Sequence, residues 1–186
     1  NSHLPASIGV LWAVEVDEGF HARFSAEARR YRYVLLNRRI RPGLAGGRVG
    51  WTHGDLDEEA MAAAAACLAG EHDFTSFRAA ECQAKSPVRL MHSVSVQRRG
   101  EVVVFDFHAN AFLHHMIRNL VGSLVFVGKG RRPVDWMAEL LAARNRSLAA
   151  PTFAPDGLYL CGVDYPPQWP LPGGGRIIAP PQLLLP

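Results

Sequence analysis

One segment, Phe105 to Gly130, limits what this chain can fold into more than any other stretch. It begins as a strand that ends in the letters FDFHA, passes through Asn110, and continues as AFLHHMIRNLVGSLVFVGKG. At about 100° per residue, a helix over 111–130 has one fully apolar side and further apolar residues around the rest. A helix that is apolar on nearly all sides is buried. The apolar side consists of Leu113, Met116, Ile117, Leu120, Leu124 and Val127.

The other side of this predicted helix carries Arg118 and Asn119 with two histidines. A guanidinium keeps its proton, and a buried cation without a partner is costly, so Arg118 needs a carboxylate, a phosphate or a polar cleft. No neighbour on its own helix supplies one. Gly122 lies one turn further on and leaves space beside the guanidinium for a small ligand or another chain segment. The alternative is a structural ion pair, for which Asp106 is the best partner within the chain.

The 186 residues are enough for one domain, with or without a tail, and a substantial core. A net charge of +3 permits an anionic partner without requiring one. Within one short span, tyrosines alternate with arginines at Tyr31 and Tyr33, which predicts a strand with an aromatic face and a cationic face. This pattern is as consistent with a strand that binds a nucleotide as with a strand whose basic face is simply exposed to solvent. The clustered arginines are Arg29, Arg30, Arg32, Arg38, Arg39 and Arg41.

Three isolated cysteines argue against a disulfide framework and a zinc site, and they predict a reducing, cytoplasmic setting. We find no basic-apolar leader and no apolar run near 20 residues, so we expect neither secretion nor a membrane span. The first residue is Asn1 and not Met, so we expect a longer parent protein. A metal or acid–base site at His108, His114 and His115 is the weakest reading, because adjacent histidines on a helix point about 100° apart.

The remaining patterns predict an α+β domain: a mainly antiparallel sheet with helices packed on one face and the other face free for a cleft. A helix begins after the N-cap Asp57, and an irregular loop over 72–87 follows it. The Pro- and Gly-rich residues 166–186 read as an extended tail. We expect strands over 8–16, 31–35, 88–97, 102–108 and 158–163, and helices over 55–70, 111–130 and 133–146.

Four stretches together resemble a known family: FHARFSAEARRYRY, LAGEHDFTSFRA, NAFLHHMIRNLVGSL and DGLYLCGVDY. In this order they are similar to the C-terminal half of the tRNA pseudouridine synthase A family, whose enzymes isomerise uridines in the anticodon arm of tRNA. The resemblance covers 1–166. It implies a pseudouridine-synthase-like fold in which 1–165 form the C-terminal domain and 166–186 the tail.

The same resemblance assigns roles to individual residues. Tyr31 matches the active-site tyrosine that stacks on the target base and is proposed to take the proton from C5. Arg118 matches the cleft arginine whose partner is the nucleophilic aspartate, and Leu158 matches an apolar residue of the uracil pocket. Ten residues match segments that touch tRNA: Phe20, His21, Ala22, Arg23 and Phe24, and Glu81, Cys82, Gln83, Ala84 and Lys85.

One departure from the family is serious, because no R-T-D-A-G-type nucleophile motif occurs in these residues. The resemblance therefore implies a chain that holds half of a site. It implies no metal and no organic cofactor, because the chemistry needs only a carboxylate nucleophile, a general base and a flipped base. It also implies a homodimer. The alternative is a module that binds tRNA or a dimer partner and catalyses nothing by itself.

Overall fold

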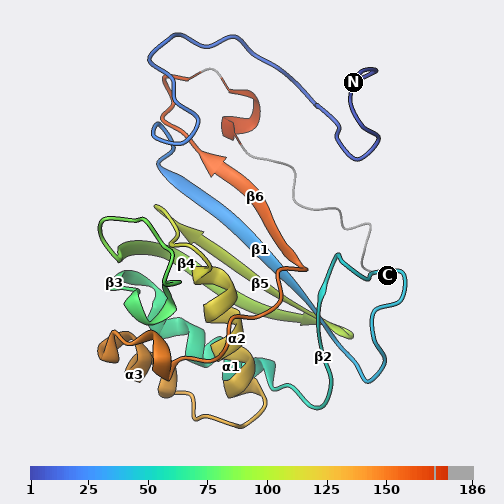
Figure 1. The fold of residues 1–186 in the computed structure, drawn as a ribbon, viewed down its shortest axis with the longest axis vertical. Helices are drawn as coiled ribbons and strands as arrows, with labels where there is room; N and C mark the ends of the chain where they lie inside the picture. Colours follow the sequence, from blue (N-terminus) through green and yellow to red (C-terminus); the bar gives the residue numbers. More distant parts are fainter. Residues whose placement is uncertain (170, 176–186) are drawn as a thin grey trace.

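A six-stranded sheet forms the centre of the computed structural model, which describes residues 1–169 and 171–175 (Figure 1). The strands run in the order β2-β1-β5-β4-β3. Strand β6 pairs with the same edge of β1 as β2 does, but β6 lies along the first part of β1 and β2 along its last part. Among the described strands only β1 and β2 pair in parallel, so the prediction of a mainly antiparallel sheet is confirmed. The strands are β1 (Ala28–Asn37), β2 (Gly50–Thr52), β3 (Gly70–Asp73), β4 (Val88–Arg99), β5 (Val102–Ala109) and β6 (Leu158–Asp164).

Three α-helices pack together on one face of this sheet, as predicted (Figure 1). The first begins where its sequence signal placed it, because the Asp57 side chain accepts a hydrogen bond from the main-chain N–H of Ala60 at 2.9 Å. It ends early in a 3₁₀ turn, and Gly70 then opens β3 at a φ of 105°, which favours glycine. The helices are α1 (Glu58–Ala65), α2 (Met116–Gly128) and α3 (Trp136–Ala143); the 3₁₀ turns are η1 (Ala66–Leu68), η2 (Thr75–Phe77), η3 (Arg146–Leu148) and η4 (Pro172–Gly175).

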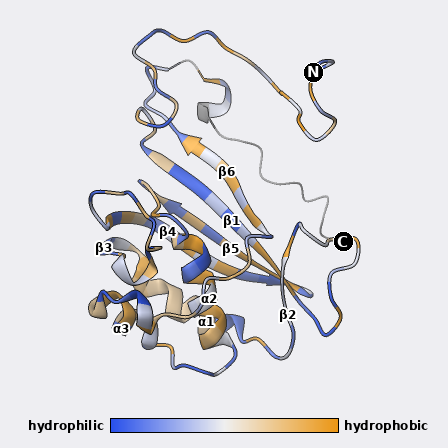
Figure 2. Cartoon of the chain, in the orientation of Figure 1, coloured by the Kyte–Doolittle hydropathy of each residue, from blue (hydrophilic) through white to orange (hydrophobic). Residues whose placement is uncertain are grey.

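The main core lies between the helices and the sheet, and hydrophobic residues concentrate there (Figure 2). From the sheet it receives Tyr33, Phe105 and Phe107, all fully buried. The loop that we predicted to be irregular contributes Phe74 and Phe77, and its first part is ordered as the end of β3 and as η2. Strands β2 and β3 had no clear signal in the sequence because each is three or four residues long.

The opposite face of the sheet carries ion pairs and a smaller apolar cluster. On it, Arg30 contacts Asp164 at 2.8 Å and Arg32 contacts Asp106 at 2.7 Å. Arg30 and Arg32 of β1 are therefore neutralised across the sheet and point away from the helices. We expected a cleft on this face, but it carries these ion pairs, and the cleft opens on the side of the sheet that the helices cover.

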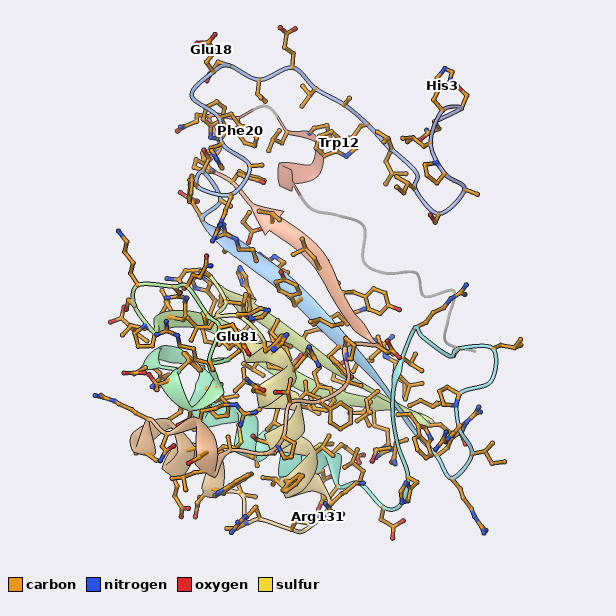
Figure 3. The ribbon with its side chains drawn as sticks, in the orientation of Figure 1. His3, Trp12, Glu18, Phe20, Glu81 and Arg131 are labelled. Atoms are coloured by element: carbon orange, nitrogen blue, oxygen red, sulfur yellow. The ribbon has the colours of Figure 1, made fainter. Side chains whose placement is uncertain are left out.

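Residues 8–16 do not form the strand that their alternating pattern predicted. They run apart from the sheet without a partner strand, and their apolar side chains are exposed, including Trp12 (Figures 1 and 3). A strand needs a neighbour to satisfy its backbone, and none of the described residues supplies one. The first part of the predicted tail also differs from expectation, because Trp169 packs edge-on against Phe20 with ring centroids 5.1 Å apart. Residues 170 and 176–186 of the predicted tail lie outside the described residues.

Candidate functional site

A cavity of about 320 Å³ lies where the N-terminal end of α2 meets β1 and the start of β6. Tyr31 reaches it from β1, Arg118 from α2 and Leu158 from the first position of β6. The turn before β6 places Leu158: Gly157 has a φ of 95°, and a Cβ there would meet the Gly50 main-chain nitrogen at 2.6 Å. The structure thus brings together, from three separate elements, the three residues that the sequence singled out.

Arg118 is held at the cavity by the segment that precedes β6. Its Nε donates a hydrogen bond to the carbonyl oxygen of Phe153 at 2.7 Å, and the Phe153 N–H donates to the Arg118 carbonyl at 3.2 Å. A Cβ on Gly122 would lie 2.6 Å from the carbonyl oxygen of Pro151, so another chain segment, and not a small ligand, fills the space beside this glycine. The chain runs close to the helix only because residue 122 has no side chain.

The carboxylate partner that Arg118 needs does not come from the described residues. Asp106 pairs with Arg32 on the other face of the sheet, so the structural ion pair that we considered for Arg118 does not form. Within 1–169 and 171–175, no Asp or Glu contacts Arg118, and its two terminal nitrogens make no hydrogen bond to the protein. The guanidinium is fixed through Nε alone, and its terminal edge is available to an acceptor in the cavity.

A buried polar network positions this arrangement, and sequence reasoning missed it. The Asn119 side chain is fully buried, and its oxygen accepts hydrogen bonds from Arg146 at 3.0 Å and from Thr152 at 2.7 Å. Its amide nitrogen donates to the Phe77 carbonyl at 2.8 Å. These bonds fasten the segment before β6 to the helix. The partners are more than 25 residues apart in sequence, so no local pattern could reveal them.

Tyr31 forms one wall of the cavity and packs edge-on against Phe112 with ring centroids 5.1 Å apart. Burial raises the pKa of Tyr31 above its ordinary value, and the positive charge of Arg29 only partly opposes this. The side chain is therefore a neutral phenol at physiological pH. It offers an aromatic face and a hydroxyl that can donate or accept a hydrogen bond.

The rim of the cavity is a turn, and not the helical start that the periodicity predicted. Helix α2 begins at Met116 because His115 has a left-handed backbone with a φ of 59°, which a helix cannot continue through. The turn stacks His114 on His115 with ring centroids 3.9 Å apart, so the two rings do not diverge as they would on a helix. Burial, aided by the charges of His114 and Arg118, lowers the pKa of His115. Both rings line the cavity.

The described residues contain no cluster of three His, Cys, Asp or Glu side chains placed to hold a metal ion. His108, the third histidine of the metal reading, lies on the other face of the sheet with its Nε2 2.9 Å from Asp164. The three histidines are thus divided between two faces of the sheet. Among the helices of 1–169 and 171–175, none combines the length and apolar character of a membrane span.

A second cavity of about 610 Å³ adjoins the first and shares Tyr31, Phe112 and His114 with it. Arginines near the starts of β1 and β4 line it, together with the loop before β4. Figure 3 places Glu81 on that loop, near the N-terminal end of α2. Five of the ten residues predicted to touch RNA line this cavity: Arg23, Glu81, Cys82, Gln83 and Ala84.

The other predicted RNA contacts divide into structural and exposed residues. Phe20 packs against Tyr165 and Trp169, and the Ala22 carbonyl accepts a hydrogen bond from the Tyr165 hydroxyl at 2.7 Å. His21 shapes its own turn, because its Nδ1 accepts hydrogen bonds from the next main-chain N–H groups. Phe24 is 76 % exposed.

Two residues of the loop before β4 differ in what they offer to a ligand. Lys85 is exposed, although it does not line the second cavity. Cys82 is buried, and its sulfur accepts a hydrogen bond from the His114 main-chain N–H at 3.4 Å. Cys82 therefore joins the loop to the rim of the first cavity.

The chain matches known proteins along most of its length. The family described as tRNA pseudouridine synthase matches residues 64–166. A tRNA pseudouridine synthase A of Aromatoleum aromaticum is 66 % identical over 183 residues, which are 98 % of this chain and 69 % of that protein. Proteins of the same name from Dechloromonas aromatica and Shewanella frigidimarina are 60 % and 55 % identical over 172 residues, 92 % of this chain and 66 % of each relative. The chain thus spans about two thirds of the length of these relatives.

Proposed function

This chain belongs to the tRNA pseudouridine synthase A family, and we propose that it forms the base-binding and tRNA-binding part of an enzyme that converts uridine to pseudouridine in the anticodon arm of tRNA. One observation carries the proposal: Tyr31, Arg118 and Leu158 meet at one cavity although they come from three elements. The cavity accepts a planar base, and the terminal edge of Arg118 is available to a carboxylate.

In this proposal the flipped uracil stacks on the Tyr31 ring and contacts the apolar side chain of Leu158. Flipping is required because a base in a stacked helix cannot reach an enclosed site. Arg118 orients the nucleophilic carboxylate, which lies outside the 186 residues. A two-pronged guanidinium suits this task because it donates two parallel hydrogen bonds to one carboxylate.

Isomerisation breaks the bond between N1 and the sugar, joins the sugar to C5, and replaces the hydrogen of C5 by a hydrogen on N1. The oxidation state of the nucleoside is the same before and after the reaction, so the reaction needs no redox cofactor. In our proposal the Tyr31 hydroxyl receives the C5 proton. Because the raised pKa keeps Tyr31 protonated beforehand, the hydroxyl gives up its own proton as it takes the new one, and N1 of the base, which gains a proton in the product, is the final acceptor.

The neighbouring surface suits an RNA strand. Phe24 offers an exposed ring on which a base can stack, and the Arg23 guanidinium lies 5.7 Å from the centre of that ring. Arg23 also lines the larger cavity, which adjoins the base pocket. By the resemblance we also propose that the whole protein is a homodimer. A tRNA substrate further leads us to place it in the cytoplasm.

The second candidate is a binding module, favoured by the lack of a carboxylate near Arg118 among the described residues. Tritium release from tRNA labelled at C5 of its uridines distinguishes the two. We expect steady release by the full-length protein, and none by the 186-residue chain although it binds tRNA. A full-length protein that binds tRNA but releases no tritium would leave only the binding module. Steady release by the 186-residue chain would refute the proposal that the nucleophile lies outside these residues.

A further inference from the structure

The larger cavity contains arginines whose hydrogen bonds go to main-chain carbonyl oxygens. Arg29 donates to the Asn110 carbonyl at 2.8 Å, and Arg89 donates through Nη1 to the Ser86 carbonyl at 2.9 Å. A carbonyl oxygen satisfies a hydrogen-bond donor but does not neutralise a cation. Both guanidiniums therefore keep their positive charge at the wall of the cavity.

Another arginine holds the loop that forms part of the cavity wall. Arg78 donates through Nη2 to the carbonyls of Cys82 and Ala84, at 2.7 and 2.8 Å. These bonds fix the loop backbone, which lines the cavity together with Arg89. Arg78 therefore fixes the position of this loop without lining the cavity itself.

The cavity lacks matching negative charge. Glu81 is the one carboxylate among its described lining residues, and it is exposed. Arg23, Arg29 and Arg89 all line the cavity, and none forms an ion pair with a described Asp or Glu. Three unpaired guanidiniums around one space of this size attract an anion.

Arg89 differs from the other two because part of its guanidinium is unsatisfied. Its Nε is buried and has no hydrogen-bond partner. Burial lowers the pKa of Arg89, since water no longer stabilises the charge fully, and the nearby Arg78 adds to this effect. An anion in the cavity would offset the cost of holding this charge away from water.

We propose that Arg89 anchors a phosphate-binding subsite in the larger cavity, which holds an RNA backbone phosphate next to the nucleotide whose base lies on Tyr31. The two cavities share Tyr31, Phe112 and His114, so a strand that places a base in one has its backbone in the other. This inference rests on the proposed function and adds a residue that the resemblance did not supply. Arg23 lies at the same cavity and takes a second phosphate contact.

The test compares Arg89→Gln with Arg99→Gln in the 186-residue chain. Arg99 is a matched control because it lies on the same strand, is exposed, and lines neither cavity. Binding of a tRNA transcript is measured over a range of salt concentrations. Loss of one phosphate contact reduces the slope of log K against log salt by about 0.7 to 0.9, which corresponds to five- to eightfold weaker binding at about 0.1 M salt. We expect this for Arg89→Gln and no change for Arg99→Gln.

Arg89→Lys keeps the charge and should retain most of the salt slope. Circular dichroism of each variant checks the fold. Equal slopes for Arg89→Gln and Arg99→Gln would overturn the subsite even if the chain binds tRNA and the proposed function stands.

If Arg89→Gln does not fold, or if the unchanged chain binds no tRNA, inorganic phosphate replaces RNA as the probe. Phosphate is titrated against the unchanged chain while the Nε–H NMR signals of the arginines are recorded. The Arg89 signal should shift and the Arg99 signal should not. A stationary Arg89 signal would overturn the subsite, whereas failure to bind tRNA would count against the proposed function alone.

Discussion

Replacing Gly122 with alanine tests how closely the position of Arg118 depends on the segment before β6. A Cβ at this position would lie 2.6 Å from the Pro151 carbonyl oxygen, whereas ordinary contacts begin at 3.4 Å. The backbone of that segment must therefore move by about 0.8 Å, since a helical Cβ cannot rotate away. Two residues later the same segment presents the Phe153 carbonyl to Arg118 Nε.

The cost can be worked out from two opposing terms. Overpacking costs about 1 to 3 kcal/mol, and alanine recovers about 1 kcal/mol of helix propensity over glycine. We therefore expect the free energy of unfolding to fall by about 0 to 2 kcal/mol. Turnover should fall further, because a hydrogen bond to a charged group is worth about 1.5 to 3 kcal/mol and its loss leaves Arg118 misplaced. That range corresponds to a loss of about tenfold or more in rate.

Gly128→Ala is the matched control on the same helix. Its Cβ would meet Leu56 Cδ1 and Met61 Sδ at 2.8 Å, which are the ends of flexible side chains far from Arg118 along the helix. Urea unfolding of the 186-residue chain gives stability, and tritium release by the full-length protein gives turnover. We expect Gly128→Ala to keep its turnover. Equal turnover for the two variants would refute the proposal that this contact positions Arg118.

Two further predictions concern ionisable groups. In the full-length protein, Tyr31→Phe should keep tRNA affinity and lose turnover, and Tyr31→Ala should also lose about 1 to 3 kcal/mol of binding; normal turnover by Tyr31→Phe would remove the hydroxyl from the mechanism. Burial raises the pKa of Asp164, but the hydrogen bonds and charges of Arg30 and His108 outweigh it and leave the pKa below its ordinary value. The stability that Asp164 contributes is therefore present above about pH 4 and lost as the pH falls through the lowered pKa. Urea unfolding at a series of acidic pH values should show a weaker decline for Asp164→Asn, and parallel curves for the two proteins would contradict this reading.

Local patterns were enough to predict much of the fold. The N-cap at Asp57, the hairpin of β4 and β5, and the alternation of Tyr31 and Tyr33 each depend on residues close in sequence, and the structure has all of them. Residues 8–16 show the limit of such reasoning. Their alternation is real, but a strand also needs a partner, and a pattern within one segment cannot show whether one exists.

The candidate site depended on contacts that no single segment encodes. The apolar pattern around Arg118 predicted a carboxylate, a phosphate or a polar cleft, and the structure supplies a main-chain carbonyl oxygen for Nε. Gly122 predicted a small ligand or another chain segment beside it, and the structure has the chain segment. The sequence could not identify Phe153 as the residue that holds Nε. It also could not show that His115 has a left-handed backbone, because the apolar periodicity continues through that position.

The central claim is that Arg118 binds and orients a carboxylate from outside these 186 residues. The Arg118→Met substitution in the full-length protein tests this claim most directly. Methionine fits the apolar surroundings and loses the hydrogen bond to Phe153, worth about 1.5 to 3 kcal/mol for a charged donor. The melting temperature should therefore fall by only several degrees. We predict a folded protein that binds tRNA normally and releases no tritium from C5-labelled tRNA. A protein that keeps its turnover, or one that loses its fold together with its activity, would contradict the claim.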